Sequence, residues 1–106
     1  MKKLYTLLAL TMSFSMNAQL TAVTEGGNTG QRLSTSNASN HGDIGSNAVD
    51  MSVQSLASST SGATGFKAVA MGSNTTASGS ISTAMGNANE ASGTFSTSMG
   101  VSTLAS

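Results

Sequence analysis

Few residues of this chain could carry out catalysis or bind a metal. The only histidine, His41, lies two residues before Asp43, and such a pair can serve as metal ligands or as an acid–base couple. A metal site typically needs three or four protein ligands, which this pair does not supply. The abundant serines do not indicate a hydrolase, because the sequence has no Gly-x-Ser-x-Gly motif and only one histidine that could serve as a base. We therefore interpret Asn40 to Asp43 as a solvated turn and expect no enzyme activity, cofactor or metal.

The first 18 residues have the pattern of an export signal. Lys2 and Lys3 supply a positive start, an apolar run follows to Met16, and Ala18 offers a cleavage point before Gln19. The apolar run is shorter than the roughly 20 residues of a membrane-crossing helix, which makes a retained transmembrane helix the weaker interpretation. The sequence therefore predicts a signal peptide over residues 1–18 and an exported, secreted product.

The composition of the remaining chain argues against a conventional globular core. Charged residues make up 8% and aromatic residues 4% of the sequence, which has 12 glycines and no cysteine. Without cysteine there is no disulfide and no lipid anchor, so stability must come from packing or assembly. Charges are few and scattered after residue 18, and they give no reason to expect nucleic acid as a partner.

A 14-residue repeat dominates the second half of the chain. Met71, Met85 and Met99 are each followed by glycine at this interval, and Ala77-Ser78-Gly79 recurs as Ala91-Ser92-Gly93. A disordered secreted linker, the competing interpretation, has no physical reason to keep such an interval. Self-similarity of this kind is typical of stacked repeats, in which each unit buries its inner face against its neighbours.

Alternation along each repeat separates a small face from a larger one. If these segments are strands, Ala84 and Gly86 point one way and Thr83 and Met85 the other. A uniformly small face suits two sheets that lie unusually close, so we predict an all-β fold, a parallel β-roll or solenoid of 14-residue repeats. The residues expected inside the roll are Ala70, Gly72, Ala77, Gly79, Ala84, Gly86, Ala91 and Gly93.

The larger residues of each repeat would then form columns on the outside of the roll. These residues are Val69, Met71, Thr83, Met85, Thr97 and Met99. A continuous apolar stripe on a solenoid usually marks a partner surface, and a closed ring of identical chains would cover every stripe at once. In the alternative arrangement, methionine fills an internal core and the small residues face water.

The motif Ser-x-Ala-x-Gly followed by Ala-x-Gly every 14 residues resembles the YadA-like head repeats of trimeric autotransporter adhesins. The resemblance covers Gly65 to Ser106. It implies a left-handed parallel β-roll, a homotrimer with the methionines at its axis, and an unknown surface or matrix ligand. Thr83 and Thr97 stand where the family often has valine or isoleucine. Any outer-membrane association would depend on a region not present here, and the relative could equally be a secreted fibre protein.

Residues 19–65 are less regular and are expected to cap the roll, whereas residues 66–106 hold the repeats, the third of them incomplete. Glu25 to Gly30 has the composition of a turn, and apolar residues alternate with polar ones from Val49 to Gln54 in the manner of a half-buried strand. The sequence thus predicts an exported cell-surface or extracellular adhesin or fibre head. An ice- or carbohydrate-binding β-solenoid is the alternative.

Overall fold

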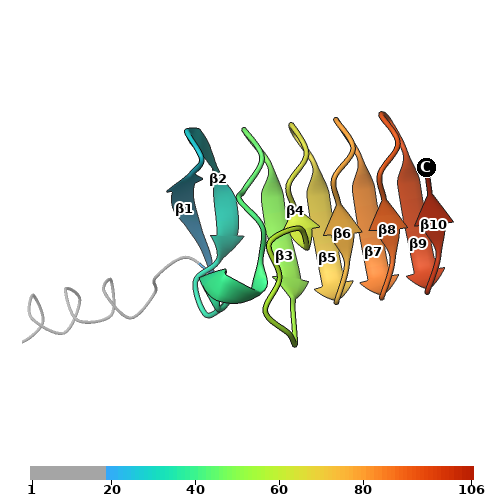
Figure 1. The fold of residues 1–106 in the computed structure, drawn as a ribbon, viewed down its shortest axis with the longest axis horizontal. Helices are drawn as coiled ribbons and strands as arrows, with labels where there is room; N and C mark the ends of the chain where they lie inside the picture. The colour runs from blue at the N-terminus through green and yellow to red at the C-terminus, as the bar shows by residue number, and fades with distance from the viewer. Residues whose placement is uncertain (1–18) are drawn as a thin grey trace, which may run out of the picture.

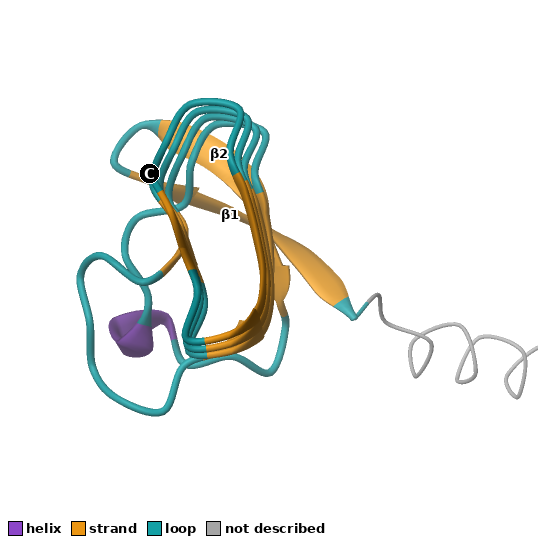
Figure 2. Cartoon of the chain, turned by 90° about the vertical axis from the view of Figure 1, so that its right-hand side faces the viewer, coloured by secondary structure: helices purple, strands orange, loops and turns teal. Residues whose placement is uncertain are grey.

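The computed structural model describes residues 19–106, which wind into a flattened coil of two β-sheets (Figures 1 and 2). The predicted signal peptide, residues 1–18, lies outside the described residues. The long-strand sheet contains, in spatial order, β1 (Leu20–Glu25), β2 (Asn28–Leu33), β3 (Val49–Val53), β5 (Val69–Ser73), β7 (Thr83–Asn87) and β9 (Thr97–Val101). The short-strand sheet contains β10 (Leu104–Ala105), β8 (Glu90–Ala91), β6 (Thr76–Ala77) and β4 (Gly62–Ala63).

From β3 onward, each turn of the coil contributes one strand to each sheet, and Figure 2 shows the successive turns superimposed along the stack. All strand pairs are parallel except β1 with β2. Equivalent residues pair across 14 positions, as Ala70 pairs with Ala84 and Met71 with Met85. The prediction of an all-β parallel roll is therefore confirmed. A 3-10 turn, Ala38–Asn40, interrupts the strands near the N-terminal end.

The interior of the roll is built from alanine. Ala70, Ala77, Ala84 and Ala91 have no exposed surface, and Ala48, Ala63 and Ala68 join the same cluster. Such side chains let two sheets approach closely while keeping the dense packing of a protein interior. The small face of each repeat is thus the inner one, and the methionines do not fill the core.

The four glycines predicted to line the interior differ in their exposure. Gly72 and Gly86 are exposed, with φ of 112° and 121°, because a positive φ interrupts the regular alternation of a strand. A Cβ added at Gly72 would lie 2.0 Å from the carbonyl oxygen of Gly86, and one at Gly79 would lie 2.1 Å from that of Gly93. Gly79 is buried and Gly93 half-buried. These glycines therefore allow neighbouring coils to stack closely, and Gly72 and Gly86 do so outside the buried interior.

The N-terminal segment already follows the coil. Strands β1 and β2 form a hairpin around Gly26 and Gly27, both with positive φ, which confirms the predicted turn. Strand β2 pairs in parallel with β3, and β3 pairs with β5 so that Val49 lies beside Val69. The predicted strand at residues 49–53 is confirmed, but its buried side carries Asp50 and Ser52. The roll is therefore continuous from the hairpin to Ala105.

Candidate functional site

The outer face of the long-strand sheet carries two in-register columns, which we call the association face. One column consists of Val49, Val69, Thr83 and Thr97, and the other of Met51, Met71, Met85 and Met99. The side chains are half-buried on β3, β5 and β7 and exposed on β9, where Met99 is 60% exposed. Aligned methionines and β-branched residues make this face a continuous stripe that is largely apolar.

The structure places all six outward residues of the repeats on this one face. It adds Val49 and Met51, which the sequence reasoning missed because their coil is six residues longer than the others. The sequence does contain a signal for this extra repeat, because Val49-Asp50-Met51 is similar to Val69-Ala70-Met71. A search for repeats at a variable interval would have found it.

A row of corner residues runs beside the first of these columns. Lys67, Ile81 and Phe95 occupy equivalent corners of successive coils, all with left-handed φ of 53° to 60°. Ile81 is 44% and Phe95 74% exposed, and the Lys67 ammonium lies 5.1 Å from the Phe66 ring centroid. A β-branched residue in this conformation is a rare and costly choice. Ile81 and Phe95 therefore add exposed apolar surface at these corners, and Lys67 adds a charge.

The outer face of the short-strand sheet has a different character. Its aligned residues are Gly62, Thr76, Glu90 and Leu104. Gly62 is buried and has no side chain, and Thr76, Glu90 and Leu104 share neither size nor polarity. This face therefore carries no regular threonine row of the kind that a flat ice-binding surface requires. The molecule thus presents one apolar and one mixed, mostly polar face.

The family comparison matches the coiled part of the chain. The model of the YadA head domain repeat matches in two copies, at residues 63–89 and 82–103. Residues 63–103 are YadA head repeats. The comparisons with curated proteins and with solved structures gave no match. The YadA head repeats extend from β4 to β9, and the association face continues from them onto β3.

Ahead of the YadA head repeats, the interior contains a buried ionic cluster, which we call the cap network: Glu25, Arg32, His41 and Asp50. Arg32 donates two hydrogen bonds to the Glu25 carboxylate, at 2.9 and 2.8 Å, and a third to the carbonyl oxygen of Gly42 at 3.0 Å. Its Nε lies 3.8 Å from Asp50 Oδ2. These contacts join β1, β2, β3 and the loop that follows the 3-10 turn.

His41 belongs to the cap network, which corrects its interpretation as part of a solvated turn. The ring is 6% exposed, and its Nδ1 lies 2.8 Å from Asp50 Oδ2. The other Asp50 oxygen accepts hydrogen bonds from the backbone N–H and the hydroxyl of Ser52, at 3.0 and 2.6 Å. Asp43, by contrast, is exposed. His41 and Asp43 thus do not act together, because the chain buries one and leaves the other in solvent.

Glu25 is held in its charged form. Its hydrogen bonds from Arg32 lower the pKa of the carboxyl below its ordinary value, and the Ile44 backbone N–H, 3.0 Å from Oε1, acts in the same direction against the effect of burial. Residues 19–106 hold no group of three or more histidine, aspartate or glutamate side chains placed to bind a metal ion. Within the same range, no helix has the length and apolar character of a membrane span.

Proposed function

We propose that this chain is the head segment of an exported, non-catalytic adhesin or fibre that assembles as a homotrimer through the association face and is displayed at the cell surface or outside the cell. The observation that carries the proposal is the register of Met51, Met71, Met85 and Met99 on the outside of YadA head repeats. Its surface or matrix ligand is contacted by the faces that remain outside.

The physical argument for self-association is the repetition of the stripe. Every coil adds one methionine and one valine or threonine to the same two columns, so a second copy presents an equally long and equally spaced surface. Burying exposed apolar area stabilises a complex by about 25 cal/mol per Å². A ring of chains closed around a symmetry axis covers the association face of every chain, whereas an open assembly leaves the face of some chains exposed.

The proposal that the chain is not catalytic is supported by the position of its single histidine. The single histidine is bonded to Asp50 inside the cap network, where it is not placed to activate a surface serine. The exported state is proposed from the signal-like pattern of residues 1–18.

The test places a charge on the association face. Replacing Met85→Asp brings like charges together at the centre of the assembly, where their burial is costly, and we expect the trimer to dissociate to monomers. Analytical ultracentrifugation measures the mass. Ser92→Asp is the matched control, because Ser92 is exposed just after β8 on the other side of the roll, and it should leave the mass unchanged. A parent that sediments as a monomer, or a Met85→Asp variant that remains trimeric, contradicts the proposal.

A further inference from the structure

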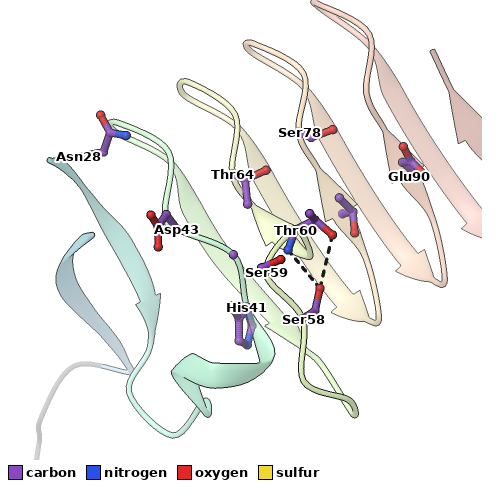
Figure 3. Close-up of a pocket in the computed structure, with 11 residues that line it drawn as sticks. Asn28, His41, Asp43, Ser58, Ser59, Thr60, Thr64, Ser78 and Glu90 are labelled. Carbon is purple, nitrogen blue, oxygen red and sulfur yellow. Dashed lines mark hydrogen bonds between the residues drawn. The ribbon is translucent and has the colours of Figure 1, made fainter. Parts of the chain in front are cut away.

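The longer coil between β3 and β5 creates a trough on the outer side of the short-strand sheet. The insertion follows β3 and forms a wall that includes Ser58 to Thr60 (Figure 3). Facing the wall are Thr64, Thr76, Ser78 and Glu90, and the N-terminal end of the trough is formed by Asn28, His41, Gly42 and Asp43. The volume of the trough, about 730 Å³, is in the range of ligand sites in proteins.

The wall is held in place by its own hydrogen bonds. The Ser58 hydroxyl accepts from the backbone N–H groups of Thr60 and Ser61, both at 3.1 Å, and lies 2.9 Å from the Ser61 hydroxyl. The Ser58 N–H donates to the carbonyl oxygen of Ser39 at 3.2 Å, and the Ser61 carbonyl oxygen accepts from Gly42 at 2.9 Å. A site whose walls are already ordered loses less conformational entropy on binding.

The lining of the trough combines neutral hydroxyl groups with two carboxylates. Ser58, Ser59, Thr60, Thr64, Thr76 and Ser78 supply the hydroxyls, each able to donate and to accept. Of the four carboxylates in residues 19–106, Glu25 and Asp50 face Arg32, whereas Asp43 and Glu90 line the trough and form no ion pair within this range. Among residues 19–106, no lysine, arginine, phenylalanine, tyrosine or tryptophan lines it.

We propose that this trough binds an oligosaccharide that carries free amino groups. The sugar hydroxyls would exchange hydrogen bonds with the serine and threonine side chains, and the ammonium groups would pair with Asp43 and Glu90. Strands β4 and β8 are two spacings apart, about 10 Å, and Asp43 lies beyond β4, so the two carboxylates suit a ligand longer than one sugar ring. Anionic glycans would be repelled by the same carboxylates.

This inference goes beyond the proposed function and does not depend on it. A single chain forms the whole trough, on the side of the roll opposite the association face. If the trimer forms, three troughs would act together on a polymeric glycan and raise the overall avidity. Failure of glycan binding would therefore leave the assembly test unaffected, and a monomeric chain would still bind.

The experiment titrates the purified full chain with a glucosamine tetrasaccharide and follows binding by calorimetry and by NMR of the backbone amides. We expect shifts at Thr60, Thr64 and Thr76. Asp43→Asn and Glu90→Gln keep the side-chain shapes and remove the charges, and each should weaken binding about two- to fivefold, the range of an exposed ion pair. Thr76→Val removes one hydroxyl from a strand position and should also weaken binding. Thr21→Val, the same change at an exposed position of β1 that lies outside both the trough and the association face, should have no effect.

Two further probes distinguish the chemical features of the ligand. The N-acetylated tetrasaccharide keeps the hydroxyls and loses the ammonium groups, and tetralysine keeps positive charge without sugar hydroxyls. Both should bind more weakly than the amino sugar. If the N-acetylated sugar binds as tightly as the amino sugar, the proposed role of the carboxylates is overturned. If tetralysine binds as tightly as the amino sugar and Thr76→Val has no effect, the trough is a site for basic peptides. If no probe shows saturable binding, the site is rejected.

Discussion

At the scale of single residues, the most informative pair is Ala84 and Thr83. Ala84 is completely buried between the two sheets, whereas Thr83, its neighbour in sequence, lies half-buried on the association face. The neighbours of Ala84 in the adjacent coils are Ala70 and Ser98, which are equally small. The paired positions above and below Ala84 therefore hold no large side chain that could move to make room for a new one.

We expect Ala84→Leu to destabilise the roll strongly, because it forces additional carbons between sheets that cannot separate without losing hydrogen bonds between strands. Overpacking usually costs about 1 to 3 kcal/mol, and this site should reach the upper end of that range. Thr83→Val should be neutral or stabilising, since it extends the valine column of β3 and β5. Urea denaturation midpoints of the two variants test the contrast, and a stable Ala84→Leu protein would contradict it.

The pH dependence of stability should reveal Glu25. The pKa of Glu25 is lowered in the folded protein. Its contribution to the free energy of unfolding is therefore fully present above the pKa of the unfolded state, close to 4.5, and is lost as the pH falls through the pKa of the folded state. Below that range both states are protonated and the contribution disappears. We expect Glu25→Gln to be less stable than the parent at neutral pH and the difference to shrink in acid. Urea midpoints measured between neutral pH and about pH 3 give this difference, and a constant difference would show that Glu25 does not act through its charge.

At the scale of elements, the corners of the coil set the spacing of the repeats. Asn74, Ala88 and Ser102 occupy one left-handed corner, and Lys67, Ile81 and Phe95 the other. Asparagine is suited to this conformation, whereas isoleucine is not, because its branched Cβ crowds the following carbonyl oxygen. Within one chain, Ile81 remains 44% exposed. Its presence at a costly position fits a contact made only in the assembly.

Ile81→Asn tests this interpretation by separating stability from association. We expect the monomeric form to gain about 1 kcal/mol, because the strain of the left-handed corner is relieved. Association should weaken at the same time, since an apolar side chain beside the association face is lost. Thermal unfolding at low concentration and sedimentation at high concentration measure the two effects. Ala88→Asn, at the opposite corner and also exposed, is the control that should leave association unchanged.

Long-range hydrogen bonds tie one coil to the next through Asn89. Its side-chain amide donates to the carbonyl oxygens of Met85 and Gly100, and its oxygen accepts from the backbone and the hydroxyl of Thr103, both at 2.9 Å. Asn89 is 1% exposed, so these partners replace the water that the amide loses on burial. A buried polar side chain thus links two neighbouring coils of the roll.

At the scale of the whole molecule, the roll has an alanine interior and large side chains outside, the reverse of a globular domain. Val53, Phe95, Met99, Val101 and Leu104 are all more than half exposed. An isolated chain therefore buries little apolar area, and small domains with little core are marginal. Assembly would supply the burial that the interior does not.

This argument predicts that thermal stability rises with protein concentration. Only the assembled form covers the association face, so mass action favours folding as the concentration increases. The midpoint of thermal unfolding, followed by circular dichroism over a wide range of concentration, should increase for the parent. It should be lower and independent of concentration for Met85→Asp. A parent midpoint that does not change would show that the single chain is stable by itself.

The sequence alone determined the roll and the facing of its side chains. A fixed interval of 14 residues and the alternation of small and large side chains are local properties, and the pairing of Met71 with Met85 follows from them directly. The tertiary structure alone decided the cap network, the trough and the glycine positions. Glu25, Arg32, His41 and Asp50 meet only because the hairpin folds over the first coil. These four residues do not recur at a fixed interval in the sequence. Mutual hydrogen bonding decides which polar side chains are buried in a narrow interior, and a hydropathy pattern does not record such bonds.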